Sequence, residues 1–108
     1  MATPRPTPDM TVTYIAETRR SLLNALGDIS WADDFMLLDL YALLVLVKGE
    51  ECTAGDIHDA WAVARTWSRP GHPDIVPFES LPERIQEYDV RYRDAVRAAA
   101  HQLREQTR

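Results

Sequence analysis

Cysteine, lysine and glycine are scarce in this chain of 108 residues. Cys52 is the single cysteine, so no disulfide can form within the chain, and a reducing, cytoplasmic location is expected. The four glycines are scattered, which excludes a glycine-rich phosphate loop. Lys48 is the single lysine, and Asp and Glu outnumber the basic side chains by 17 to 12. The net charge of −5 argues against charge-driven binding to nucleic acid or to an anionic membrane.

The sequence also lacks a hydrophobic run long enough to cross a membrane. Its most apolar segment, FMLLDLYALLVLV at residues 35–47, contains Asp39 and falls short of the roughly 20 residues that a transmembrane helix needs. Because apolar side chains occupy nearly every face of this segment, it predicts a buried helix at the centre of the fold. We therefore expect no membrane contact.

Length and composition indicate one globular domain. A chain of this size builds a single core without the help of a metal or a disulfide, and its hydrophobic share of 45% is ordinary for a globular protein. We expect a disordered, proline-rich tail at residues 1–10 and a single helical domain at residues 11–108. Apolar residues at helical spacing predict the first helix at residues 12–26.

Capping residues predict where the other helices begin. The expected N-cap residues, in chain order, are Ser30, Thr53, Ser80 and Asp89. Ser30 is followed by Asp33, and Thr53 by Asp56, each three residues later as in a capping box. The Pro-Gly pair at 70–71 ends the third helix near residue 67 or 68. The expected fold is an all-α compact bundle of four main helices plus a short helix that starts at Ser80.

A connector rich in proline, HPDIVPFESLP at residues 72–82 and here called the strap, follows the third helix. Each proline biases the residue before it toward extended backbone and restricts the unfolded chain. We therefore expect an extended strap that lies across the helices and fixes how the last helix docks on the third. Its apolar segment at residues 75–78 is able to pair as an edge strand.

No set of residues in the sequence amounts to a catalytic centre. The three histidines show neither H-x-x-x-H nor H-E-x-x-H spacing, and His58, Asp59 and His72 fall short of three or four convergent zinc ligands. Adjacent acidic residues such as Asp33 and Asp34 diverge by about 100° on a helix, which does not suit an acid–base pair. We expect a non-enzymatic protein with no metal ion and no cofactor.

The richest local pattern lies on the predicted third helix, where His58, Trp61 and Arg65 recur at i, i+3 and i+7 and share one face. In one interpretation Trp61 belongs to the core and Arg65 pairs with an acidic residue of a neighbouring helix. In the other, aromatic rings and guanidinium groups line a groove that stacks on a planar group or holds a phosphate. The candidate ligand- or partner-binding residues are His58, Trp61, Arg65, Trp67, Arg69, His72 and Phe78.

Five short motifs within residues 56–99 follow one another in the order of a known family. They comprise His-Asp-x-Trp-Ala in the third helix, His-Pro and Val-Pro-Phe in the strap, Leu-Pro at its end, and a later Tyr-Asp pair. Their positions are His58, Asp59, Trp61, Ala62, His72, Pro73, Val76, Pro77, Phe78, Leu81, Pro82, Tyr88 and Asp89. This part resembles the ryanodine-receptor repeat. The chain departs from the family pattern in a shorter loop before the strap, in Phe78 for the usual Tyr and in Gln86 for a frequent Lys.

The resemblance implies a regulatory surface module without catalytic activity, as in calcium-release channels, and nucleotide-like ligands for some members. The whole layout is similar to small actinobacterial and actinobacteriophage proteins. Two hypotheses follow. In the first, the protein is a non-enzymatic interaction or regulatory module that self-associates or binds a protein partner, such as a host protein. In the second, it senses or sequesters an anionic, nucleotide-like small molecule between the third helix and the strap.

Overall fold

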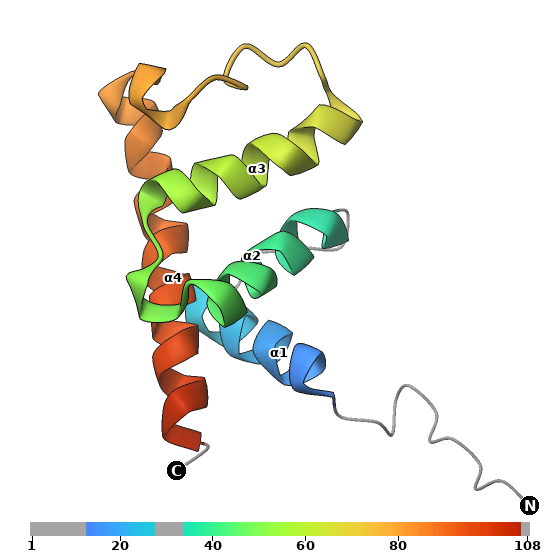
Figure 1. The fold of residues 1–108 in the computed structure, drawn as a ribbon, viewed down its shortest axis with the longest axis vertical. Coiled ribbons are helices and arrows are strands. Elements are labelled where there is room, and N and C mark those ends of the chain that lie inside the picture. Colours follow the sequence, from blue (N-terminus) through green and yellow to red (C-terminus); the bar gives the residue numbers. More distant parts are fainter. Residues whose placement is uncertain (1–12, 28–33, 107–108) are drawn as a thin grey trace, which may run out of the picture.

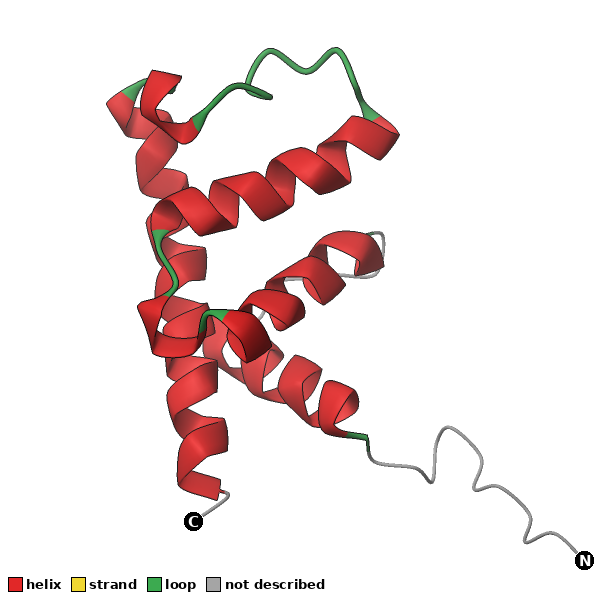
Figure 2. Cartoon of the chain, viewed as in Figure 1, coloured by secondary structure: helices red, strands yellow, loops and turns green. Residues whose placement is uncertain are grey.

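The computed structural model describes residues 13–27 and 34–106. Four α-helices make up most of this part, namely α1 (Tyr14–Leu26), α2 (Phe35–Val47), α3 (Ala54–Ser68) and α4 (Glu83–Gln106). Short 3-10 turns at Gly49–Glu51 and Phe78–Ser80 precede α3 and α4. The described residues contain no strand (Figure 2). The all-α class is therefore confirmed.

Helix α4 is the longest element and contacts each of the other three helices. Figure 1 shows α1, α2 and α3 extending from α4 toward the same side. Leu22 of α1, Ile57 of α3 and Val96 of α4 are fully buried in one core cluster, to which α2 contributes residues such as Leu38. The core is therefore shared by all four helices.

The N-terminal capping box predicted for α3 is confirmed. The backbone N–H of Asp56 donates to Oγ1 of Thr53 at 3.1 Å, and the backbone N–H of Thr53 donates to Oδ2 of Asp56 at 3.0 Å. The pair satisfies two backbone donors at a helix end, where no intrahelical acceptor is available. Helix α3 ends at Ser68, as the Pro-Gly turn predicts.

Helix α2 begins at Phe35, and the side chain of Asp34 caps it by accepting from the backbone N–H of Leu37 at 3.3 Å. The N-cap predicted at Ser30, its partner Asp33 and the tail predicted at residues 1–10 lie outside the described residues.

The prediction of a short helix that ends before a new helix at Asp89 is wrong, because α4 runs without a break from Glu83 to Gln106. No glycine or proline interrupts this segment, so nothing in the backbone forces a break. Asp89 lies in the helix interior, and its side chain faces α3 instead of capping an N-terminus. Ser80 belongs to the 3-10 turn, and α4 starts directly after Pro82.

The strap forms no edge strand, which corrects the expectation for residues 75–78. The carbonyl of Val76 accepts a hydrogen bond from a side chain of α3, and Phe78 begins the 3-10 turn. The amide of Gln86 on α4 donates to the carbonyls of Phe78 and Leu81 at 3.0 and 3.1 Å. Side chains of α3 and α4 therefore satisfy strap carbonyls that a neighbouring strand would otherwise bond.

The composition of α2 predicts burial on nearly all faces, and this prediction is wrong. Its inner face packs in the core, but five large apolar side chains are 42–65% exposed, namely Phe35, Met36, Leu43, Leu46 and Val47. The helices packed against α2 cover only its inner side, so composition overstates its burial. No helix among residues 13–27 and 34–106 has the length and apolar character needed to span a bilayer.

Candidate functional site

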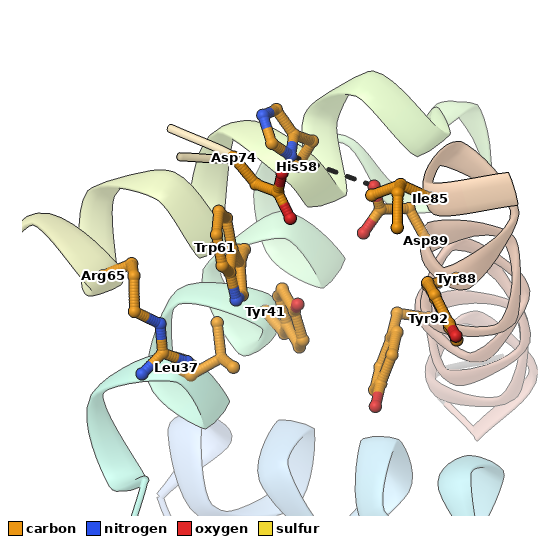
Figure 3. Close-up of a pocket in the computed structure, with 10 residues that line it drawn as sticks. All are labelled: Leu37, Tyr41, His58, Trp61, Arg65, Asp74, Ile85, Tyr88, Asp89 and Tyr92. Carbon is orange, nitrogen blue, oxygen red and sulfur yellow. Dashed lines mark ion pairs between the residues drawn. The ribbon is translucent and has the colours of Figure 1, made fainter. Parts of the chain in front are cut away.

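A pocket of about 390 Å³ opens between α2, α3, α4 and the strap (Figure 3). Its volume is within the range of small-molecule sites, roughly 300–1,000 Å³. Helix α3 contributes three of the residues predicted from the sequence. The lining residues are Leu37 and Tyr41 of α2, His58, Trp61 and Arg65 of α3, Asp74 of the strap, and Ile85, Tyr88, Asp89 and Tyr92 of α4.

His58 and Asp89 form the most buried polar part of the pocket. The His58 residue is 3% exposed, and its Nε2 lies 2.6 Å from the carbonyl oxygen of Val76. Because a carbonyl only accepts, Nε2 carries the hydrogen of this bond. The other ring nitrogen, Nδ1, lies 4.0 Å from Oδ2 of Asp89, whose side chain is 14% exposed. Burial raises the pKa of Asp89 to about 6, and the proximity of His58 acts in the opposite direction.

Trp61 forms an aromatic wall that its neighbours hold in place. Its ring stacks with the His58 ring at a centroid distance of 5.6 Å, and the edge-on His72 ring lies 5.0 Å away. The guanidinium of Arg65 lies 5.5 Å from the Trp61 centroid and 3.6 Å from the carboxylate of Asp34 at the start of α2. The first sequence interpretation is therefore confirmed, since Trp61 packs against the core and Arg65 pairs with an acidic residue of a neighbouring helix. Trp61 also lines the pocket, and ligand binding there stays a prediction.

Tyrosines supply the remaining aromatic surface. The Tyr41 and Tyr92 ring centroids are 5.4 Å apart, and Figure 3 shows Tyr88 and Tyr92 across the pocket from Trp61. Burial raises the pKa of the Tyr41 phenol far above its ordinary value, so this group stays protonated at neutral pH. The pocket therefore presents flat apolar walls together with a few polar groups, a combination typical of small-molecule sites.

The other candidate residues do not line the pocket. His72 and Phe78 contact residues that line it, since the His72 ring lies 5.0 Å from the Trp61 ring and the Phe78 ring lies 6.1 Å from the His58 ring. Trp67 is 78% exposed, and Arg69 is exposed beyond the end of α3. The structure therefore brings His58, Trp61 and Arg65 into one cavity and leaves Trp67 and Arg69 outside it.

Asp89, Tyr41, Tyr92 and Asp74 were not recognised as site residues from the sequence. A local signal existed on α4, because Ile85, Tyr88, Asp89 and Tyr92 recur at helical spacing and share one face. The interpretation of Asp89 as an N-cap concealed that pattern.

Two other chemistries find little support in the described residues. No three His, Cys, Asp or Glu side chains there form a group able to hold a metal ion. Cys52 is fully buried, and burial raises the pKa of its thiol to about 11. It is therefore a protonated core side chain at neutral pH, whereas a reactive cysteine is a thiolate.

Comparison with known families supports one assignment. A family model described as "Domain of unknown function (DUF7701)" matches residues 13–101, which include every residue that lines the pocket. No curated protein matches the chain, and no solved structure matches it. The family match covers most of the chain and spans α1 to α3 and most of α4, so the chain belongs to the DUF7701 family.

Proposed function

We propose that this protein is a non-enzymatic, cytoplasmic regulatory module that binds a small planar molecule in the pocket between α2, α3, α4 and the strap. The cavity itself carries the proposal. It combines aromatic walls with polar groups that are mostly buried. Aromatic faces at Trp61, Tyr41 and Tyr92 suit the stacking of a flat ring.

The arrangement of His58 argues against hydrolytic catalysis. A catalytic histidine uses one ring nitrogen to accept the proton of a nucleophile while an acidic residue orients the other. In this pocket Nε2 of His58 donates to the carbonyl of Val76, and no Ser, Thr or Cys is among the described residues that line it. The His58–Asp89 pair is better suited to ligand contact than to general-base chemistry.

The charges in the pocket favour a ligand with two different ends. Arg65 offers a cationic side chain at one end, where it already pairs with Asp34. His58 and Asp89 lie at the other end (Figure 3), and Asp74 is a second carboxyl group that lines the pocket. A nucleotide-like molecule fits this division, with its anionic group toward Arg65 and its ring among the aromatic side chains. The resemblance to the ryanodine-receptor repeat is consistent with such a ligand and remains a prediction.

A thermal-shift screen tests ligand binding directly. The panel comprises nucleosides, nucleotides, cyclic dinucleotides and ADP-ribose derivatives. A ligand at 100 times its Kd stabilises the folded state by about 2.7 kcal/mol and raises Tm. Trp61→Ala should abolish the shift because it removes the stacking wall, whereas Trp67→Ala, an exposed tryptophan on the same helix, should preserve it. Absence of a shift for every compound at millimolar concentration would contradict ligand binding.

A second candidate function, self-association, is favoured by the exposed outer face of α2. Met36, Leu40, Leu43 and Val47 follow the alternating four- and three-residue spacing of a coiled-coil seam, and all but the half-buried Leu40 are exposed. In an antiparallel pair with a second copy, Met36 lies opposite Val47 and Leu40 opposite Leu43. The acidic N-terminal end at Asp34 then faces the Lys48 end of the partner, and the two helix dipoles oppose each other favourably.

Light scattering coupled to size exclusion measures the oligomeric state. We expect a dimer whose apparent mass halves in Leu43→Glu, since a charge in the seam loses its hydration on pairing. Val63→Glu is the matched control, because Val63 is equally exposed but lies on α3. A wild-type protein that stays monomeric at high concentration would exclude this function.

A further inference from the structure

Two hydrogen-bond acceptors, one on the buried His58 and one on the mostly buried Asp89, face each other in the pocket, and no described residue places a donor between them. Nε2 of His58 donates its hydrogen to the carbonyl of Val76, so a neutral ring presents a lone pair at Nδ1. Nδ1 lies 4.0 Å from Oδ2 of Asp89, beyond hydrogen-bond length. Among the described residues, Asp89 has no hydrogen-bond donor, and its ionised carboxylate only accepts. Buried acceptors without donors are costly, so this end of the pocket favours a ligand that supplies N–H groups.

Apart from His58, the described groups that line the pocket around Asp89 supply no positive charge to it. Tyr41 faces it from α2, His58 from α3, Asp74 from the strap, and Tyr88 and Tyr92 from α4 itself. Tyr41 is protonated at neutral pH, and Asp74 adds a second carboxyl group. Arg65 is the only Arg or Lys among the described lining residues, and it already pairs with Asp34, the residue that caps α2.

We infer that the pocket recognises a flat ring bearing two adjacent N–H donors, as in the 2-amino-4-oxopyrimidine edge of guanine-type and pterin-type compounds. The inference rests on the proposed ligand-binding function. It specifies which edge of the ligand ring forms hydrogen bonds with the protein. The two oxygens of Asp89 accept from the ring N–H and the amino group in a bidentate pair, and Nδ1 of His58 accepts the second amino hydrogen. Trp61 lies beside this pair and stacks on the ring.

The arrangement of hydrogen-bond donors distinguishes a guanine-type ring from adenine and hypoxanthine. Adenine offers one donor beside an acceptor nitrogen, which a carboxylate repels. Hypoxanthine keeps the ring N–H and lacks the amino group. A hydrogen bond to a charged group contributes about 1.5–3 kcal/mol, so loss of the amino group should weaken binding by roughly 10- to 150-fold.

Isothermal titration at pH 7.5 with guanosine, inosine, adenosine and xanthosine tests the inference, and GMP, free guanine and a pterin distinguish the source of the ring. We expect guanosine to bind at least about 10-fold more tightly than inosine or adenosine. Asp89→Asn should weaken guanosine binding and strengthen xanthosine binding, because an amide offers one acceptor and one donor that match the xanthine N–H and carbonyl. Asp59→Asn, an exposed change on α3, should leave all affinities unchanged.

The pH dependence gives a second readout. The bidentate pair needs an ionised Asp89, whose pKa burial raises to about 6, so guanosine affinity should rise between pH 5 and pH 7. A flat profile, or tighter binding at pH 5, would count against the carboxylate pair.

The outcomes separate this inference from the broader proposal. Equal affinities for guanosine and inosine, with no effect of Asp89→Asn, would overturn the donor-edge inference. The ligand-binding function would still stand if Trp61→Ala abolished binding of either compound. If no guanine-type or pterin compound binds at millimolar concentration, the inference fails, and the wider thermal-shift screen then decides the function.

Discussion

Leu22→Ala is expected to lower the free energy of unfolding by about 2–5 kcal/mol. Leu22 lies on α1 and is fully buried in the core shared by all four helices. Truncation to alanine removes apolar contacts and leaves a cavity that the surrounding helices fill only in part. For a domain whose total stability is about 5–15 kcal/mol, this is a large fraction. Urea denaturation followed by circular dichroism at pH 7 measures the change.

Val63→Ala is the matched control for that experiment. Val63 lies on α3 with 53% of its surface exposed, so its truncation should change stability by no more than about 0.5 kcal/mol. If Leu22→Ala were as mild as this control, the burial of α1 against the rest of the core would be wrong.

Asp89→Asn is expected to act in the opposite direction and to raise the free energy of unfolding by about 1–3 kcal/mol above pH 6. The Asp89 side chain is 14% exposed, and no hydrogen-bond donor reaches its carboxylate among the described residues. Its ionised form therefore loses hydration on folding without replacement bonds. An amide of similar shape carries no charge, so the substitution removes this cost.

The gain should depend on pH in a defined window. Burial raises the pKa of Asp89 in the folded protein from 3.8 to about 6, so between these values the folded protein holds a proton that the unfolded chain has lost. The contribution of this group to stability therefore falls as pH rises from about 4 to about 6 and stays constant above. The difference between Asp89→Asn and wild type should be near zero at pH 4 and reach its full value above pH 6.

Urea midpoints of the two proteins from pH 4 to pH 8 test this window. Asp59→Asn, which changes an exposed carboxylate, should show no comparable trend. Destabilisation by Asp89→Asn at pH 7 would show that the carboxylate makes favourable bonds in the folded protein. A buried carboxylate that costs stability is typical of functional sites, which connects this experiment to the proposed pocket.

Local signals in the sequence were sufficient for several elements of the fold. The Thr53–Asp56 capping box and the Pro-Gly turn placed both ends of α3 correctly, because caps and turns depend on residues close in the chain. A local signal of the same kind, the N-cap preference of Asp89, wrongly predicted a helix start at that residue. A helix interior free of glycine and proline, packed against the core, outweighed one favourable N-cap residue.

The sequence by itself determined the all-α class, the boundaries of α3 and the shared face of His58, Trp61 and Arg65, because helical spacing and local cap and turn residues set them. Only the tertiary structure decided that Asp89 meets His58 and that Tyr41 and Tyr92 complete the pocket. These side chains come from three helices far apart in sequence. Their meeting depends on how α2, α3 and α4 dock and on the strap carbonyl that holds His58, and spacing within one helix contains no information about that docking.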